Sequence, residues 1–109
     1  MIKNDTRAWI VRVQNVTASR NLDVEYTNQT GRTLFVQVSL RCQTLLNTDV
    51  ALAAIIVSGI SVHVFGHQLF VADITQSVSF VVPPGAKYKI VNGATGTGSL
   101  TKIGWTEAF

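Results

Sequence analysis

The chain has 109 residues, of which 47% are apolar and only 14% are charged, and its formal net charge at pH 7 is +3. This length suits one domain with its own hydrophobic core, so we expect residues 1–109 to form a single domain. The basic residues are scattered along the chain, which argues against a nucleic-acid partner. Ordinary soluble domains have roughly 25% charged residues, and the shortage here indicates that another subunit covers part of the surface.

The first residues carry no recognisable targeting segment. Met1 to Arg7 is polar and no apolar leader follows it, so we expect synthesis and folding in the cytoplasm. The longest apolar run, Val50 to Val57, is far shorter than the roughly 18 residues of a membrane helix, which excludes membrane insertion by a helix. Ala8 to Val13 is expected to form a lead-in strand, with Trp9 on its core side.

The next elements are a short strand, a turn and a long strand. Val24 to Thr27 is expected as the short strand, and Asn28 and Gly31 are expected to take the positive φ angles of the turn. From Leu34 onward the sequence alternates with the period of a strand that has one buried face. The residues of the predicted core face are Val36, Val38, Leu40 and Cys42, and those of the other face are Gln37, Ser39, Arg41 and Gln43. The single cysteine therefore reads as a buried apolar residue.

The run from Val50 to Val57 is apolar at every position. A helix capped at Asn47 to Asp49 is one interpretation, but the β-branched residues near its end favour a strand. A strand in an antiparallel sheet normally alternates, so this one predicts cover on both faces. We expect a neighbouring subunit to provide the second cover, with alanines at 51, 53 and 54 allowing close approach; a long loop of the same chain is the alternative.

Strand signals continue to the end of the chain at the spacing of an all-β sandwich or barrel. We expect strands over 60–65, 68–72, 77–82, 87–91 and 100–107, with a break at Pro83-Pro84-Gly85 because proline has no N–H to donate. The residues predicted to face the core are Val78, Phe80, Val82, Tyr88, Ile90, Ile103 and Trp105. The expected fold class is all-β: an antiparallel, jelly-roll-like β-sandwich.

Residues that could carry out chemistry are few. The six acids fall in turns, ends or polar phases, and Asp23 and Glu25 form the only close pair, so we expect no enzyme activity. His63 and His67 flank Gly66, which we expect to form a turn between them, but no third ligand accompanies them. We therefore predict no metal and no cofactor. The glycine-rich segment 92–99 leads into a strand rather than a helix, which excludes a phosphate-binding loop.

Several phrases of the sequence resemble the C-terminal tip domain of bacteriophage tail fibres. They are Val16-Thr17-Ala18-Ser19-Arg20, Tyr26-Thr27-Asn28, Thr30-Gly31-Arg32, the segment from Val78 to Tyr88, and Ile103-Gly104-Trp105-Thr106-Glu107, in that order. The resemblance implies a homotrimeric β-sandwich knob in the virion, assembled in the host cytoplasm. Such a knob binds a bacterial surface glycan or an outer-membrane protein during host adsorption.

The resemblance does not carry specific receptor contacts, and residues 1–13 stand where a fibre shaft would precede the domain. We select His67, Asn92, Thr95 and Thr97 as contact candidates because loops on a rigid sandwich usually carry recognition. Two other functions stay open. One is a structural virion or tail protein without receptor binding, and the other is a monomeric carbohydrate-binding β-sandwich module.

Overall fold

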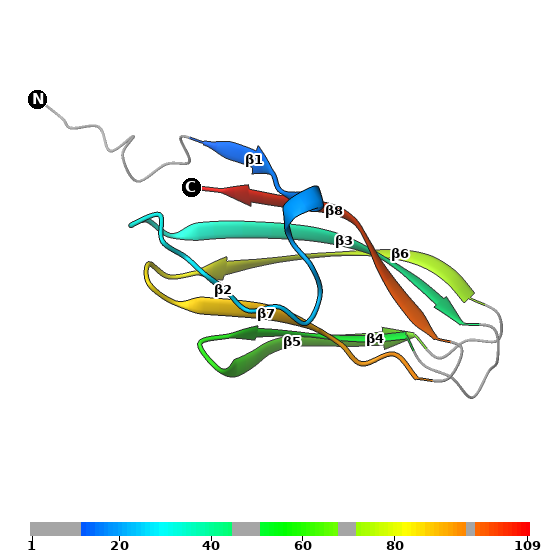
Figure 1. Ribbon diagram of the computed structural model, residues 1–109. Coiled ribbons are helices and arrows are strands. Elements are labelled where there is room, and N and C mark those ends of the chain that lie inside the picture. Colours follow the sequence, from blue (N-terminus) through cyan, green and yellow to red (C-terminus); the bar gives the residue numbers. More distant parts are fainter. Residues whose placement is uncertain (1–11, 45–50, 68–71, 96–97) are drawn as a thin grey trace, which may run out of the picture.

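The computed structural model describes residues 12–44, 51–67, 72–95 and 98–109, and these form a sandwich of two four-stranded antiparallel sheets (Figure 1). The all-β, antiparallel sandwich predicted from the sequence is confirmed. One 3₁₀ turn, η2 (Thr17–Ser19), is the only helical element of the described residues. The strands are β1 (Val13–Asn15), β2 (Tyr26–Thr27), β3 (Leu34–Thr44), β4 (Ala51–Val57), β5 (Ile60–His67), β6 (Ala72–Val82), β7 (Lys87–Asn92) and β8 (Ser99–Ala108).

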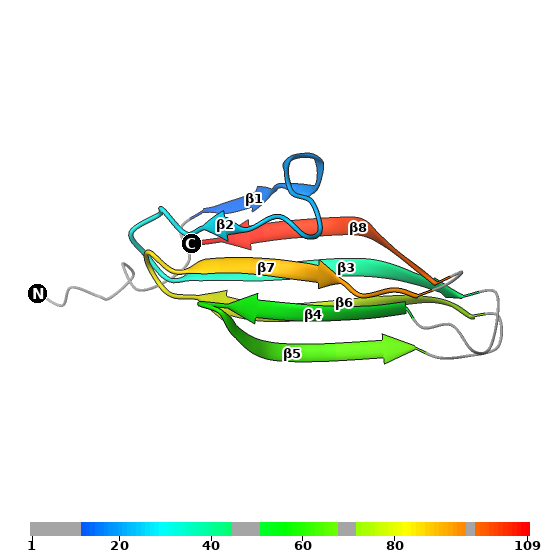
Figure 2. The ribbon, with the colours of Figure 1, turned by 60° about the horizontal axis from the view of Figure 1, so that its bottom comes forward.

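The strand order is that of a jelly roll. The first sheet runs β1-β8-β3-β6 and the second runs β2-β7-β4-β5, so the chain crosses repeatedly between the two layers (Figure 2). Eight strands in two interlocked Greek keys define this architecture. In the described part of the chain, no helix is long and apolar enough to cross a membrane.

The core lies between the sheets and is built from alternate residues of each strand. In β3 the predicted core face is confirmed, because Val36, Val38, Leu40 and Cys42 are all buried. In β6, β7 and β8 the same holds for Val78, Val82, Tyr88, Ile90 and Trp105, and Phe80 packs half-buried against them. Alternation along a strand is a local property, and it identified these faces without knowledge of the strand order.

The apolar run around residue 54 is a strand, as predicted. Its core face consists of Ala51, Ala53, Ile55 and Val57, while Leu52, Ala54 and Ile56 point to the opposite face and are half-buried. The expectation that alanines 51 and 53 belong to a subunit interface is wrong, because both lie in the core between the two sheets. Only Ala54 of the three lies on the outward face.

One strand differs from its predicted face. Ile103 was expected in the core but is exposed, because the pairing of β3 with β8 shifts between Ser39 and Leu40 and leaves Ile103 as the extra residue of a bulge. In β5, to which the sequence assigned no core face, Val62 and Val64 are exposed. This strand is the last of its sheet and pairs only with β4 among the described strands.

The turns follow the expected chemistry in part. Gly31 and Gly85 have φ angles of 75° and 79°, as predicted, and such values favour glycine. Asn28 does not take a positive φ; its side chain organises the turn instead. Gly66 lies inside β5 rather than in a turn, so His63 and His67 do not belong to the two arms of a hairpin.

Some expected elements have other bounds. The predicted strand from Val24 is shorter and begins at Tyr26, since Asp23 adopts a turn conformation with φ 63°. Strand β6 starts at Ala72 rather than at Ser77. Trp9 and most of the predicted lead-in strand lie outside the described residues, as do residues 68–71 of the strand expected over 68–72.

Candidate functional site

A charged pair is buried at the end of β8. The carboxylate of Glu107 is only 4% exposed, and it accepts hydrogen bonds from Arg20 Nη2 to Oε1 (2.9 Å) and from Arg20 Nε to Oε2 (3.0 Å). The Tyr88 hydroxyl of β7 donates a further hydrogen bond to Oε2. Bidentate pairing of a guanidinium with a carboxylate is among the stronger charge-assisted hydrogen-bond arrangements. It joins the segment before β2 to the last strand.

Aromatic rings surround this pair. Trp105 Nε1 donates to the Tyr88 hydroxyl (3.3 Å), and the Arg20 guanidinium lies 4.7 Å from the centroid of the Tyr26 ring. Tyr26 is in edge contact with Trp105, and Phe80 is in edge contact with Tyr88, at centroid distances of 6.2 and 5.5 Å. Glu107 is therefore enclosed by apolar surface and by its hydrogen-bond partners, while Arg20 is only partly buried, and this burial strengthens the electrostatic attraction.

The protonation states follow from this enclosure. Burial raises the pKa of Tyr88 well above its ordinary value, and the hydrogen bond to Glu107 raises it further, so the phenol stays protonated and donates. The hydrogen bond from Arg20 to Glu107 raises the pKa of the guanidinium, which stays charged. Both oxygens of Glu107 are occupied by these partners. We conclude that the cluster of Arg20, Tyr88, Trp105 and Glu107 holds residues 16–20 against β8; these residues, distinct from the predicted lead-in strand, are here called the lead-in segment.

The lead-in segment is fixed by further contacts to β8. Lys102 Nζ donates to the carbonyls of Thr17 and Arg20, and the Trp105 N–H donates to Thr17 Oγ1 (2.9 Å). Lys102 lies beside the bulge at Ile103, opposite Leu40. The irregularity in β8 thus accompanies the anchoring of residues 17–20.

Asn28 is a second buried polar centre. Its Nδ2 donates to the carbonyls of Arg32 (2.7 Å), Val82 (2.9 Å) and Pro83 (3.1 Å), and its Oδ1 accepts from the N–H and hydroxyl of Thr30 (3.0 and 2.7 Å). The Asn28 side chain therefore joins the turn before β3 to the turn after β6. Buried backbone carbonyls need such partners, because leaving them unpaired is costly.

The two polar centres lie at the same end of the sandwich. A pocket of about 250 Å³ there is lined by Arg20, Tyr26, Asn28, Tyr88 and Glu107, among others. Arg20, Tyr88 and Glu107 bond to one another, and Asn28 bonds to backbone carbonyls and to Thr30, so these side chains are engaged within the fold. Side chains from segments far apart in the sequence, at residues 20, 26–32, 82–88 and 105–107, line or support this end and hold the fold together.

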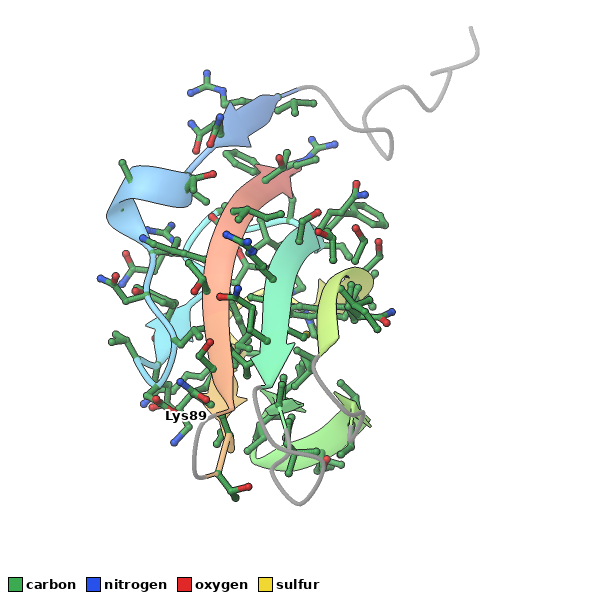
Figure 3. All side chains as sticks on the ribbon, turned by 90° about the vertical axis from the view of Figure 1, so that its right-hand side faces the viewer. Lys89 is labelled. Atoms are coloured by element: carbon green, nitrogen blue, oxygen red, sulfur yellow. The ribbon has the colours of Figure 1, made fainter. Side chains whose placement is uncertain are left out.

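The strand ends gather at the opposite end of the sandwich. The pairing places Thr44 beside Ala72, Gln43 beside Ser99, and Ala51 beside His67. In Figure 1 this is the end away from both termini, and Figure 3 views the molecule from that side. Six strands begin or end there: β3, β5 and β7 end at this surface, and β4, β6 and β8 begin at it.

The four predicted contact residues map to this end to different extents. His67 is the last residue of β5 and Asn92 the last of β7; they flank β4 on opposite sides, at Ala51 and Ala53, so two strand spacings separate them. That is about 10 Å at the usual spacing between strands. The side chain of His67 and all of Thr97 lie outside the described part of the chain. The backbone therefore brings His67 and Asn92 to one surface, but not into contact.

Asn92 and Thr95 are both exposed. The Asn92 N–H donates to Asp23 Oδ1 (2.9 Å), its side-chain oxygen accepts from the Ala94 N–H (3.1 Å), and the Thr95 carbonyl accepts from the Gly98 N–H (2.7 Å). These bonds shape a compact turn after β7 and tie it to the turn at Asp23. The pairing of Asp23 with Glu25 on one strand face is not observed, because Asp23 lies in that turn.

Sequence reasoning missed Glu107, which it placed in a polar phase. Alternation alone gives no signal for this residue, because its partner Arg20 is 87 residues away.

Among the described residues, no group of three or more His, Cys, Asp or Glu side chains is arranged to hold a metal ion. Comparison of the sequence with protein-family models and with curated proteins finds no match.

Proposed function

We propose that this chain is the tip domain of a bacteriophage tail fibre, a homotrimeric virion protein that binds a bacterial surface glycan or outer-membrane protein. The resemblance of its sequence phrases to such domains supports this, and so does where those phrases lie. Val16 to Arg20, Pro83 to Tyr88 and Ile103 to Glu107 are far apart in the sequence but meet around Glu107 and Asn28. Segments that are far apart in the sequence but pack together hold the fold in place, so proteins that share the fold are expected to share them.

The observation that carries the proposal is which end of the sandwich the N-terminal residues join. Arg12 and Phe109 exchange two backbone hydrogen bonds (2.8 and 2.9 Å), so residues before Arg12 join the sandwich at the end of the two polar centres. A shaft preceding this domain would attach there. The surface of strand ends, with His67, Asn92 and Thr95, would then lie farthest from the shaft and face the cell. Recognition residues commonly occupy such connections on a rigid scaffold.

Binding without catalysis fits the acidic residues that the structure describes. Glu107 is held by Arg20 and Tyr88, Asp23 accepts from the Asn92 N–H, and Glu25 lies 3.8 Å from Lys87. Glycoside hydrolysis needs two carboxylates facing one substrate across a gap of several ångströms. These three carboxylates do not face one another in that way, which favours a binding domain.

Receptor binding is tested with the purified, fluorescently labelled protein on a panel of bacterial strains and on their extracted surface polysaccharides. Size exclusion with light scattering is expected to give three copies per particle. We expect saturable adsorption to some strains, and preincubation with the protein is expected to block infection of those strains by a phage that uses the same receptor. Thr95→Ala is expected to weaken adsorption about tenfold, while the matched variant Thr33→Ala, exposed near the opposite end, leaves it unchanged.

A structural tail protein is the second candidate, and the largely uncharged outer face of the first sheet favours it. A trimer that adsorbs to no strain and blocks no infection would support that role and reject receptor binding. A stable monomer with measurable oligosaccharide affinity by calorimetry would instead identify a carbohydrate-binding module. Equal adsorption of the Thr95 and Thr33 variants would indicate that the receptor contacts do not lie at the strand ends.

A further inference from the structure

The sandwich has two separate apolar surfaces that no part of the described chain covers. The first crosses the outer face of the first sheet, where pairing aligns Val13 of β1, Ala108 of β8, Phe35 of β3 and Val81 of β6 in one row. Phe35 is 41% exposed and Val81 52%. The row borders a groove of about 450 Å³, here called the Phe35 groove, lined by Val13, Phe35, Val36, Gln37, Ser79, Phe80, Val81, Thr106 and Ala108.

The second apolar surface is on the other sheet. Ile60, Val62 and Val64 of β5 are 66%, 51% and 57% exposed and are here called the β5 row. The register shifts at Val62, so Val64 lies opposite the outward-facing Ala54 and Ile60 opposite Val57; the three residues follow the strand edge rather than one face of the sheet. Strand β5 is at the edge of its sheet, and apolar edge strands invite pairing or coverage by another chain. Soluble monomers rarely leave large apolar patches open to water, so two such surfaces on so small a domain call for a partner.

The surroundings of the Phe35 groove indicate which partner. The next row across the first sheet is Asn15, Thr106, Gln37 and Ser79, and the row after it includes Gly104, Ser39 and Ser77, so no charged side chain occurs in three successive rows. The outer face of the second sheet differs, since β7 presents Lys87 and Lys89, the latter projecting from the surface in Figure 3. A neutral face of hydroxyls and amides both donates and accepts hydrogen bonds. It meets a second copy without like-charge repulsion.

The number of different surfaces indicates the kind of assembly. A twofold dimer uses one self-complementary patch on each copy, whereas a ring uses two different patches, each matched to the other on the next copy. A groove on one sheet and exposed apolar residues along the edge of the other are two different surfaces, which fits the second case. A stable interface covers about 800 Å² on each partner, so the neutral rows beside the groove must contribute as well.

Resting on the homotrimer of the proposed function, we infer that the trimer closes head to tail: the β5 row of each copy packs into the Phe35 groove of the next. Every copy then contributes one groove and one row, and none of either is left open. The strand-end surface with Asn92 and Thr95 lies outside both contacts and stays accessible to a receptor.

The contact is tested with Val64→Cys and Val81→Cys and a short bismaleimide cross-linker. Both new thiols are exposed, whereas the natural Cys42 is fully buried, so the parent chain serves as the unreactive control. We expect co-refolded mixtures of the two variants to give covalent dimers, and each variant alone to give none. A chain with both substitutions is expected to give covalent trimers. Circular dichroism and thermal melting verify that every variant folds.

Three results would overturn the inference. Cross-linking of either single variant to itself would indicate a twofold contact, and a trimer without mixed cross-links would place the interface elsewhere. A monomer by light scattering would mean that both surfaces are covered by something other than a second copy. Receptor binding is judged separately: a head-to-tail trimer that adsorbs to no cell rejects the proposed function alone, while self-cross-linked chains that do adsorb reject only the arrangement.

Discussion

Arg20 and Glu107 form a two-pronged ion pair between the segment before β2 and the end of β8, with N···O distances of 2.9 and 3.0 Å. The pair spans nearly the whole described chain in sequence, and it sits where the two sheets meet the lead-in segment. The contacts of Lys102 with the Thr17 and Arg20 carbonyls and of the Trp105 N–H with Thr17 fix the same segment.

Glu107→Ala is expected to destabilise the protein by about 3–5 kcal/mol, because it leaves the Arg20 guanidinium partly buried and unpaired. The free energy of unfolding in urea measures the loss. Glu25→Ala is the matched control, since Glu25 and Lys87 form an ion pair at 3.8 Å with both side chains more than half exposed. The control is expected to cost at most about 1 kcal/mol. Equal losses of unfolding free energy in the two variants would show that the Arg20–Glu107 pair contributes no more to stability than the exposed pair.

Tyr88 is expected to make stability depend on alkaline pH. Burial raises its pKa in the folded protein, whereas an unfolded tyrosine titrates near 10. The folded state therefore holds the phenol proton more tightly, so this stabilisation is complete below about pH 10 and is lost as the pH rises from there towards the folded pKa. We expect the free energy of unfolding of the parent to fall above about pH 10 more steeply than that of Tyr88→Phe. Parallel pH profiles would contradict the assignment.

Asn28→Asp is expected to destabilise the fold by about 3 kcal/mol or more, because carboxylate oxygens would replace the amide group that donates to three carbonyls. Thermal unfolding monitored by circular dichroism measures the effect. Gln29→Glu introduces a similar charge at the neighbouring exposed position and is expected to leave the melting temperature nearly unchanged. A stable Asn28→Asp protein would mean that other groups satisfy these carbonyls.

Ala53 and Ala54 are neighbours on opposite faces of β4, and arginine is expected to affect them differently. Ala53→Arg would place an unpaired charge in the core, at a cost of several kcal/mol out of a total stability of about 5–15 kcal/mol. We expect this variant not to fold. Ala54→Arg points away from the core and is expected to keep the strand signal in circular dichroism. A folded Ala53→Arg protein would contradict the assigned face of β4.

Cys42 is expected to resist thiol reagents in the native protein. It is fully buried in β3, and burial raises the pKa of its thiol, which lowers the thiolate fraction. Reaction with an aromatic disulfide reagent should be slower than in denaturant by at least about a thousandfold, as expected if it proceeds through an unfolded fraction of about 10⁻³ or less. The exposed cysteine of a Thr33→Cys variant, outside both apolar surfaces, is the internal standard. Rapid labelling of the parent chain would show that the core opens locally.

The sequence was informative wherever one strand's own pattern decides the outcome. The faces of β3, the strand character of β4 and the positive φ angles of Gly31 and Gly85 are all set by residues within a few positions. It failed where a partner from another strand matters. Ile103 is exposed because the register with β3 shifts between Ser39 and Leu40 and leaves Ile103 as the extra residue of a bulge.

In the candidate site, too, locally determined features could be predicted from the sequence, and features that depend on distant segments could not. The predicted loop residues could be recognised as candidates because turn composition is local, but their separation across β4 depends on sheet order. Nothing in the sequence around Glu107 indicates burial, because an isolated carboxylate belongs on the surface until a guanidinium joins it. The role of Asn28 was likewise assigned to its backbone, whereas its side chain makes the contacts.

By itself, then, the sequence determined that this protein is an all-β sandwich, since period-two alternation and glycine turns are properties of neighbouring residues. Only the tertiary structure decided which strands lie side by side, that Arg20 meets Glu107, and that the Phe35 groove and the β5 row are left uncovered. The physical reason is that burial of a side chain depends on what the rest of the chain places over it, and contacts between distant segments leave no periodic trace in the sequence.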